Sequence, residues 1–239
     1  MNDMTLEARV QRLEDIEAIK QLMSRRAYIH SAGMHRLELE ECWVKQTPDP
    51  TFEPEDWGMW VGHDSIYKSY VEGAPPVDPG MMIEHTLTTA VIEIAGDRQT
   101  AKGVWISPGH ETFPQPDGLP IAHWSWGRYS VDFALEDGVW KIWHLHVLTT
   151  FRTPYHQDWV DSSINRPSHF PPLGETLPGM YPSDKPVTFN QPYSVDALPA
   201  IQPEPPTPYT TFAETTSYAD APTRVRRLHT NDDAQVTDD

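Results

Sequence analysis

The chain has 239 residues, of which 38% are hydrophobic and 24 are prolines, and it carries a formal net charge of −17. This length suits one domain of ordinary size with an extension, or two small domains. The negative charge argues against binding to nucleic acid or to an anionic membrane surface, and without a run of about 18 apolar residues no membrane span is expected.

Apolar residues in the first third of the chain recur every three or four positions. They predict a helix from residue 5 to about residue 31, with charged residues such as Glu14 and Asp15 on the opposite face. A shorter helix is expected over residues 37–43. A third is expected over residues 62–73, where a glycine and the prolines after it end the pattern.

A single cysteine, Cys42, lies in the second predicted helix. It excludes an internal disulfide framework and fits a reducing compartment, and we expect a buried structural thiol rather than a nucleophile. The charged N-terminal segment has no apolar core of a secretion signal, so a cytoplasmic protein is expected.

Runs of β-forming residues fill the middle of the chain. Residues 85–107 predict two strands joined by a turn at residues 95–98, and residues 123–151 predict a second hairpin that turns at residues 136–138. Helices followed by long antiparallel hairpins indicate an α+β fold, in which the helices pack against one face of a sheet.

The last of these strands contains the sequence VWKIWHLHV. Strict alternation puts Trp140, Ile142, His144 and His146 on one side, so both histidines are expected to face the same interior as the tryptophan and the isoleucine. At least one of the two is expected to reach a pocket, and a β-bulge would exchange them.

Regular patterns end near Arg152, where the chain becomes rich in proline. We predict a first domain over residues 1–151 and an extended arm over residues 152–239. About the last 20 residues of the arm are expected to be disordered. Aromatic residues predict that the arm anchors on its own domain or on a neighbouring subunit. These residues are Tyr155, Trp159, Phe170, Tyr181, Phe189 and Tyr193.

Four segments, which span roughly residues 5 to 150, carry a family resemblance. They are LEDIEAIKQLMSRRAYIHSAG, HDSIYKSYVE, HTLTTAVIEIAGDRQTAKGVW and GRYSVDFALEDGVWKIWHLHV. In their order and spacing they resemble the NTF2-like superfamily and, within it, the branch of SnoaL-like proteins and scytalone dehydratases.

The resemblance implies a cone, in which a strongly curved antiparallel sheet wraps around N-terminal helices and leaves a pocket at its open end. Such enzymes do acid–base chemistry on small aromatic or polyketide molecules without a metal or an organic cofactor. Relatives form dimers or trimers, so a homo-oligomer is expected, with the arm exchanged or packed across the interface. The fold also includes members that only bind ligands.

The resemblance places a catalytic histidine at His85, which opens the strand HTLTTAVIEI. Relatives often pair this histidine with an acidic residue near the end of the first helix, where this chain has Ser31 and Ala32. His30 or Tyr28 is therefore expected to supply the partner. Imidazole suits the task because its pKa of about 6.5 gives access to either protonation state near neutral pH. The predicted catalytic residues are thus His85, His144, His146, Tyr28 and His30.

Further aromatic and histidine side chains are expected to contact a substrate. A pocket with several tryptophans favours a flat, apolar ligand with one or more aromatic rings. The predicted substrate-binding residues are Trp60, Trp105, His110, His123, Trp126 and Tyr129.

These patterns predict a cofactor-independent lyase that acts on a phenolic aromatic small molecule. A base would take the phenolic proton while an acid protonates the leaving benzylic hydroxyl, and the quinone-methide-like intermediate would then lose a proton or expel formaldehyde. The layout also resembles the lignin-derived diarylpropane lyases, which deformylate their substrates in this way.

Three alternatives stay open at this point. The first is a dehydratase or isomerase of a hydroxylated polycyclic or polyketide-type substrate, and the second is a module that binds a ligand without turning it over. The third is a metal enzyme in which His144 and His146, joined by His85 or His123, supply imidazole ligands.

Overall fold

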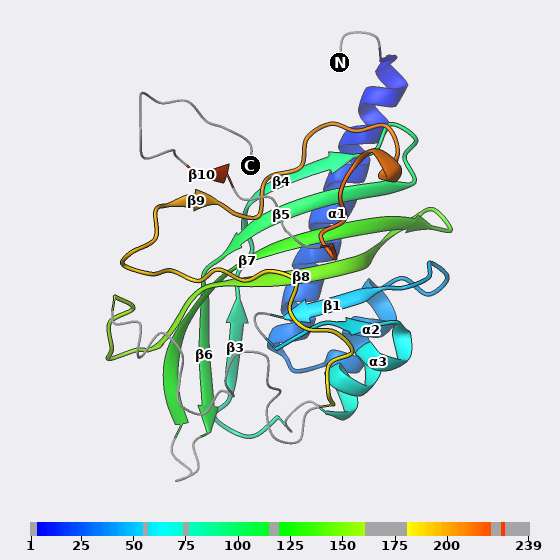
Figure 1. Cartoon of the computed structure of the whole chain (residues 1–239). Coiled ribbons are helices and arrows are strands. Elements are labelled where there is room, and N and C mark those ends of the chain that lie inside the picture. Colours follow the sequence, from blue (N-terminus) through cyan, green and yellow to red (C-terminus); the bar gives the residue numbers. More distant parts are fainter. Residues whose placement is uncertain are drawn as a thin grey trace, which may run out of the picture.

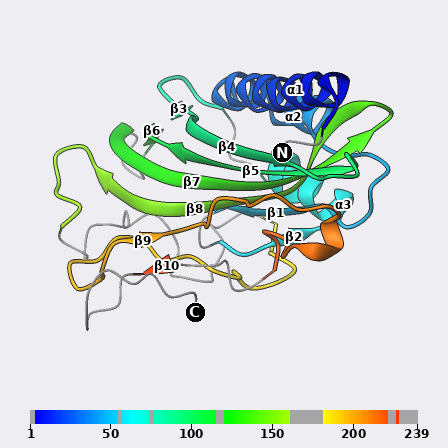
Figure 2. The ribbon, with the colours of Figure 1, turned by 90° about the horizontal axis from the view of Figure 1, so that it is seen from above.

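The computed structural model describes residues 4–54, 57–73, 77–114, 120–160, 181–220 and 226–227. In these segments, helices cover one face of a curved sheet and the C-terminal arm lies along the other face (Figures 1 and 2). This is the α+β arrangement that the sequence predicts. None of the described helices is both long and apolar enough to cross a lipid bilayer.

Helical segments precede most of the sheet, as expected. They are α1 (Leu6–Ser31), α2 (His35–Cys42), α3 (His63–Tyr67) and the π-helical turn η1 (Lys68–Glu72). The hydroxyl of Thr5 caps α1 by accepting a hydrogen bond from the backbone N–H of Ala8 at 3.2 Å. Cys42 is buried on α2, and burial raises the pKa of its thiol to about 11, which confirms an inert structural thiol.

One curved sheet of eight strands forms the centre of the described structure. The strands are β1 (Thr51–Pro54), β2 (Trp60–Val61), β3 (Met82–His85), β4 (Thr88–Ile94), β5 (Thr100–Ser107), β6 (Gly109–Pro114), β7 (Pro120–Glu136) and β8 (Val139–Pro154). They pair in the order β2–β1–β8–β7–β5–β4, while β6 pairs with β7 and with β3. The β1–β8 pair is parallel, so the sheet is mixed rather than wholly antiparallel as expected.

Both predicted hairpins are present. Strands β4 and β5 meet in a turn that contains Arg98 at φ 58°, and β7 and β8 meet at Asp137 (φ 50°) and Gly138 (φ 79°). Positive φ at these positions gives the backbone twist that joins neighbouring strands through a short turn.

Helix α1 buries a charged residue that was expected to face solvent. Asp15 is only 3% exposed, and it accepts hydrogen bonds from Nε of Arg98 at 2.6 Å and from the indole N–H of Trp140 at 3.0 Å. The predicted orientation of Asp15 is wrong because Arg98, in the β4–β5 turn, reaches back to the helix and compensates its charge. Helical periodicity cannot show such a long-range partner.

The two faces of the sheet have different partners, as Figure 2 shows. The inner face packs against α1 and α2 and contributes Val131, Phe133 and Trp140 to the hydrophobic core. The outer face lies against the arm. Strand residues alternate between the two faces, so the face of each side chain follows from the register of its strand.

A β-bulge at Trp143 changes which residues of β8 reach each face. The register of β8 against β7 shifts by one residue at this position. Ile142 and Leu145 consequently both belong to the inner core. His144 and His146 both reach the outer face, where the arm covers them. The expectation that the two histidines share the face of Ile142 is therefore wrong.

The arm follows the outer face from one edge of the sheet to the other, in yellow to orange in Figure 1. Near one edge, the backbone N–H of Met59 donates to the carbonyl of Lys185 at 2.9 Å. At the β4–β5 turn, the N–H of Asp97 donates to the carbonyl of Thr210 at 2.9 Å. The short elements of the arm are β9 (Ala200–Ile201), the 3₁₀ turn η2 (Phe212–Glu214) and β10 (Arg226–Arg227). The predicted anchor Phe170 and most of the expected disordered end lie outside the described residues.

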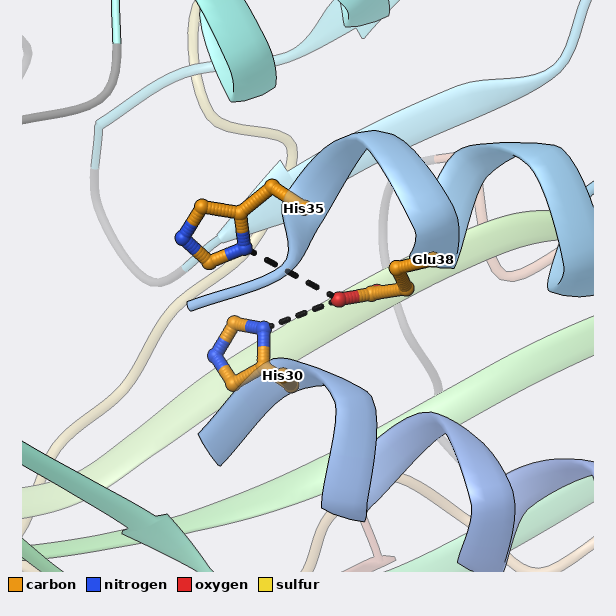
Figure 3. Close-up of side chains that lie close together, drawn as sticks. All are labelled: His30, His35 and Glu38. Atoms are coloured by element: carbon orange, nitrogen blue, oxygen red, sulfur yellow. Dashed lines mark hydrogen bonds and ion pairs between the residues drawn. The ribbon is translucent and has the colours of Figure 1, made fainter. Parts of the chain in front are cut away.

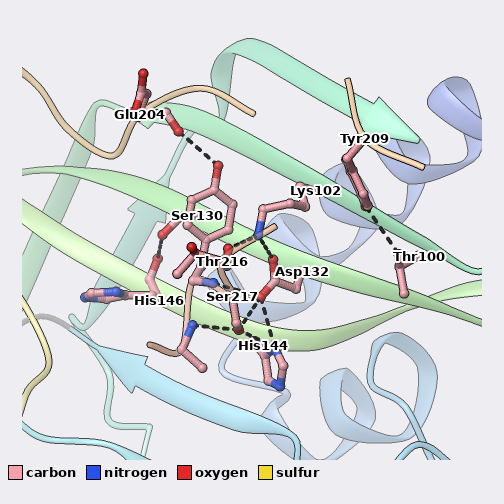
Figure 4. Close-up of polar contacts among 12 residues, drawn as sticks. Thr100, Lys102, Ser130, Asp132, His144, His146, Glu204, Tyr209, Thr216 and Ser217 are labelled. Atoms are coloured by element: carbon pink, nitrogen blue, oxygen red, sulfur yellow. Dashed lines mark hydrogen bonds and ion pairs between the residues drawn. The ribbon is translucent and has the colours of Figure 1, made fainter. Parts of the chain in front are cut away.

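A polar cluster on the outer face fastens the arm (Figure 4). Asp132 of β7 lies at its centre, 2.5 Å from Nζ of Lys102 and 2.9 Å from Nδ1 of His144. The hydroxyl of Ser217, from the arm, donates to the same carboxylate at 2.7 Å. Burial alone would raise the pKa of Asp132, but Lys102 and His144 hold it below its usual value. His144 thus serves to attach the arm.

Glu53 of β1 makes a second attachment to the arm. It is fully buried and accepts hydrogen bonds from the backbone N–H of Thr188 at 2.6 Å and from its hydroxyl at 2.9 Å. No lysine or arginine pairs with it among the described ion pairs, and burial raises its pKa to about 7. The neighbouring His146, 3.5 Å away, stays neutral because burial lowers its pKa to about 4.

The Glu53→Gln variant should be less sensitive to pH than the natural chain. Since the pKa of Glu53 rises from 4.5 to about 7 on folding, ionisation opposes folding, and this loss of stability develops between about pH 5 and pH 7. It amounts to about 3 kcal/mol at most. Glutamine keeps an acceptor for Thr188 but cannot ionise. Urea unfolding at about pH 5 and pH 8 measures the free energy of unfolding of both chains. Relative to the natural chain, the variant should become more stable at pH 8 than at pH 5, by up to this amount.

The exposed Glu41→Gln variant is the matched control, and its stability difference should be independent of pH. A Glu53→Gln difference that is the same at both pH values would contradict a buried, late-ionising carboxyl group.

Candidate active site

Three imidazoles meet at one end of the inner face, where the end of α1, the start of α2 and the end of β3 come together. The ring centroid of His30 lies 5.2 Å from that of His35 and 5.4 Å from that of His85. The side chains of His30, His35 and His85 are 12%, 15% and 17% exposed, respectively. These rings are therefore the part of the cluster that solvent reaches, and the carboxylates that contact them are buried.

Glu38 of α2 is the buried centre of the first half of the site (Figure 3). Its Oε1 lies 2.8 Å from Nε of Arg26, and its Oε2 lies 3.0 Å from Nδ1 of His30. The hydroxyl of Tyr70 donates to Oε1 at 2.9 Å. Nδ1 of His35 lies 4.0 Å from Oε2. The carboxylate thus links α1, α2 and η1.

The charges around Glu38 determine which groups in this half of the site carry a proton. Burial alone would raise the pKa of Glu38, but Arg26 and His30 hold it well below its usual range, so the carboxylate is ionised. Burial lowers the pKa of His30 to about 4, so the ring is neutral near pH 7. A neutral ring that donates its Nδ1–H to Glu38 keeps its lone pair on Nε2. His30 is therefore arranged as a proton acceptor.

His85 of β3 is the centre of the second half. Its Nε2 lies 2.8 Å from Oε1 of Glu111, which also accepts a hydrogen bond from Nη2 of Arg152 at 2.7 Å. The hydroxyl of Tyr129 lies 3.4 Å from Nδ1 of His85. Gly109 stands opposite His85 in β6, and a Cβ atom there would lie 2.9 Å from Cδ2 of the ring. The glycine therefore leaves room for the imidazole.

Glu111 is ionised for the same reason as Glu38. Burial alone would raise its pKa, but Arg152 and His85 hold it well below its usual range. The carboxylate fixes the ring of His85 through Nε2 and stabilises a proton that the ring takes up. Since Glu111 occupies Nε2, the nitrogen left for proton exchange with a bound molecule is Nδ1, whose neighbour is the Tyr129 hydroxyl at 3.4 Å.

The site therefore contains two similar relays that oppose each other. They are Arg26–Glu38–His30 and Arg152–Glu111–His85. Two imidazoles whose rings are 5.4 Å apart can remove a proton at one point of a small molecule and deliver a proton at another.

The structure brings several of the predicted site residues together. His30, His85 and Tyr129 lie in the cluster. His123 is buried on the same face of β7, and Trp105 of β5 packs in the core beside Tyr129. The catalytic and binding roles expected of these residues stay predictions.

Three predicted catalytic residues lie elsewhere. Tyr28 is 83% exposed, because it points away from the sheet on the solvent side of α1, so its expected place in the pocket is wrong. His144 and His146 are on the outer face as a result of the β-bulge, and the sheet separates them from His85.

Trp60 belongs to the inner hydrophobic core, where its ring stacks on Phe52, and its indole N–H donates to the carbonyl of Tyr181 in the arm at 3.1 Å. The binding role expected of Trp60 stays a prediction.

Two other predicted substrate-binding residues lie on the outer face of the sheet. The ring of His110 packs against Trp124 at 4.9 Å, and alternation puts both on the outer face. Trp126 shares that face and stacks on another ring there. The predicted place of His110 and Trp126 in the pocket is wrong because both lie on the other side of the sheet.

Six residues of the cluster were not predicted from the sequence, namely Arg26, His35, Glu38, Tyr70, Glu111 and Arg152. One of them left a readable signal. Arg26 continues the buried stripe of α1 that includes Ile19 and Met23, so it is a charged residue at core spacing. The partners of Glu111 come from distant segments and left no such signal. Glu38 is only eight residues from His30, but the two meet because α1 and α2 pack together, which periodicity does not show.

His30, His35 and Glu38 could also hold a metal ion. One ligand atom from each lies within 4.8 Å of the others, and no other such group of histidine, cysteine and acidic residues occurs in the described part of the chain. Imidazole and carboxylate are common zinc ligands. The metal set considered from the sequence, with His144 and His146, does not converge, since these two residues lie on the opposite face of the sheet from His85.

Comparison with known proteins agrees with the fold. A family model described as a SnoaL-like domain matches residues 11–146, more than half of the chain. A structure from Novosphingobium aromaticivorans DSM 12444, proposed to be a scytalone dehydratase, has a TM-score of 0.51 and 18% identity, and it covers 62% of this chain and 91% of that one. The structure of LinA has a TM-score of 0.52 and 17% identity, with 62% and 95% covered.

A type 2 hexachlorocyclohexane dehydrochlorinase (LinA) has a TM-score of 0.50 and 19% identity, with 66% of this chain and 98% of that one covered. At these identities the likeness shows a shared fold, and it confirms the fold predicted from the sequence. No curated protein sequence matches the chain.

Removal of the carboxylate in Glu38→Ala should destabilise the protein strongly. The change leaves the buried guanidinium of Arg26 without its counter-charge, which costs about 3–5 kcal/mol in comparable buried pairs. Urea unfolding measures this loss. Glu40→Ala, at an exposed position of the same helix, is the control and should change stability by less than about 0.5 kcal/mol. Equal stabilities of the two variants would contradict a buried ion pair at Glu38.

Proposed function

The chain belongs to the SnoaL-like domain family, in the scytalone-dehydratase-like branch of the NTF2-like superfamily, and we propose that it is a lyase. The proposed reaction is acid–base catalysis on a phenolic aromatic small molecule. The observation that supports the proposal is the pair of opposed histidines, His30 and His85. Their rings are 5.4 Å apart, and each is fixed by a buried carboxylate.

A benzylic alcohol with a phenolic hydroxyl needs two proton transfers at opposite ends of one ring. His30, which is neutral, takes the phenolic proton at Nε2. The imidazolium form of His85, paired with Glu111, gives a proton to the benzylic hydroxyl, which leaves as water. The product of this step is a quinone methide. A single imidazole cannot reach both oxygens, so two separated groups suit the reaction.

The second step restores both histidines. His85, now neutral, takes the proton of a neighbouring hydroxymethyl group. The carbon–carbon bond breaks, formaldehyde leaves, and the bonding electrons return the ring to a phenolate. His30 then gives its proton to the phenolate oxygen. If the substrate lacks a hydroxymethyl group, His85 removes a carbon-bound proton instead and the reaction is a plain dehydration. In both cases the protons balance without an external acid or base.

Two features favour elimination as the reaction class. A single His–acid dyad has one imidazole that can carry a proton, whereas this site has two. One can therefore remove a proton while the other gives a proton to the leaving group. In addition, two proteins of the same fold are named a scytalone dehydratase and a hexachlorocyclohexane dehydrochlorinase, and both names describe eliminations.

Within this class we propose a phenolic diarylpropane diol as the substrate, with loss of water and formaldehyde. The Tyr129 ring lies beside His85 and gives the site an aromatic neighbour for such a molecule. Dehydration or isomerisation of a hydroxylated polycyclic substrate is the second candidate, favoured by the same pair of histidines. A homo-oligomer, with the arm exchanged or packed across the subunit interface, is part of the proposal, and the mass in solution checks the oligomeric state.

The test is an absorbance assay on chelator-dialysed protein with a panel of phenolic diarylpropane diols and hydroxylated aromatic alcohols. Formation of a conjugated product gives new near-ultraviolet absorption. The methyl ether of an active phenol should not react, because it has no phenolic proton for His30 to remove. Equal turnover of phenol and methyl ether would contradict the mechanism.

His85→Ala should lower kcat/KM by about 100–10,000-fold, the usual contribution of a general acid or base. His63→Ala removes an exposed histidine at the start of α3 and should leave the rate unchanged. Circular dichroism should show both variants folded. A folded His85→Ala variant with full activity would exclude His85 from the chemistry, and a folded natural chain that is inactive on the whole panel would favour ligand binding without turnover.

A further inference from the structure

We propose that His30, His35 and Glu38 form a binding site for one divalent transition-metal ion of the Zn²⁺ class, and that the bound ion inhibits the proposed lyase by occupying His30. The site goes beyond the lyase reaction, which uses His30 and His85 as proton carriers and needs no ion. Only the inhibition depends on the proposed function.

The spacing of the three ligand atoms suits a small cation. Nδ1 of His30 is 3.0 Å from Oε2 of Glu38, Nδ1 of His35 is 4.0 Å from the same oxygen, and all three lie within 4.8 Å of one another (Figure 3). Ligands at about 2.0–2.1 Å from a tetrahedral Zn²⁺ are about 3.4 Å apart. The two measured distances from Oε2 lie on either side of that value, so small side-chain rotations bring the atoms into position.

The surroundings of Glu38 match those of a metal-binding carboxylate. Arg26 pairs with Oε1 of Glu38, while the two histidines face Oε2. The hydroxyl of Tyr70 lies within hydrogen-bond distance of both oxygens, 2.9 Å from Oε1 and 2.8 Å from Oε2. Partners of this kind orient a carboxylate ligand and keep it ionised when an ion binds. The compensation of Glu38 by Arg26 is therefore compatible with a ligand role for Oε2.

The ring of His35 packs against those of Tyr70 and His30, with centroids 4.7 Å and 5.2 Å apart, and its Nδ1 faces the carboxylate. Its Nδ1 is a buried atom without a hydrogen-bond partner among the described residues, and it points toward Oε2 of Glu38 (Figure 3). A buried polar atom without a partner is costly, and a metal ion would satisfy it. The side chain is still 15% exposed, so an ion can reach it from solvent. The net charge of −17 also attracts cations to the protein.

Metal binding would change the chemistry of His30. In the free site the ring donates Nδ1–H to Glu38 and keeps its lone pair on Nε2. An ion bound at Nδ1 requires the lone pair at that nitrogen, so the proton of the neutral ring moves to Nε2. The atom that would accept the phenolic proton then becomes a donor. No proton is gained or lost in this exchange, and the ion acts as an inhibitor.

Titration of untagged, chelator-dialysed full-length protein with Co²⁺ tests the site. Tetrahedral coordination should produce strong visible d–d absorption, and added Zn²⁺ should abolish it by displacement. His35→Ala should weaken Co²⁺ binding by more than about 100-fold, since even loss of an outer-shell partner costs 10–100-fold. His63→Ala should bind as the natural chain does. His35→Gln, which keeps a polar side chain of similar length, should lose binding as His35→Ala does.

Each other outcome overturns part of the proposal. Absence of Co²⁺ absorption at millimolar concentration would exclude the site, and so would binding that both His35 variants retain. Binding without loss of lyase activity would exclude the effect on His30. The spectrum needs no turnover, so the metal site can be decided even if no substrate in the panel reacts.

Discussion

The burial of two carboxylates, each matched by a buried arginine, is the constraint on which the arrangement of this end of the molecule depends. Glu38 lies between Arg26 and His30 and so joins α1 to α2 and η1. Glu111 joins β3, β6 and β8 in the same way. An ionised carboxylate is stable in such a place only when charges and donors surround it. The same contacts that allow burial therefore fix the orientation of the imidazoles.

The position of the acids distinguishes this chain from the pattern expected of its relatives. The histidine at the end of β3 is kept, but its carboxylate comes from β6 rather than from the end of the first helix. That helix position has Ser31 and Ala32, and the neighbouring His30 has an acid of its own. The result is two opposed relays instead of one dyad. This arrangement provides two proton carriers, which an elimination with a distant leaving group requires.

The sheet separates two uses of histidine. On the inner face, imidazoles lie at the edge of solvent and exchange protons in the proposed reaction. On the outer face, His144 and His146 lie under the arm, beside Asp132 and Glu53. The β-bulge at Trp143 makes this division, because it turns β8 over from His144 to Thr149, until a second register shift near Thr150 returns Arg152 to the inner face. The residues that attach the arm are therefore different from those of the proposed reaction, and the sheet lies between the two sets.

The sequence by itself determined the helices, both hairpins, the class of fold and the place of His85, because these depend on local periodicity, on turn residues and on a family pattern. It did not determine the face of His144, the burial of Asp15 or the acidic partners of His30 and His85. The face of His144 depends on a one-residue shift in strand register, and the burial of Asp15 and the pairing of His85 depend on contacts between distant segments. His30 and Glu38 are eight residues apart, but they meet only because α1 and α2 pack together. Alternation gives the face of a side chain only while register is regular, and the partner of a buried charge is known only when the chain has folded.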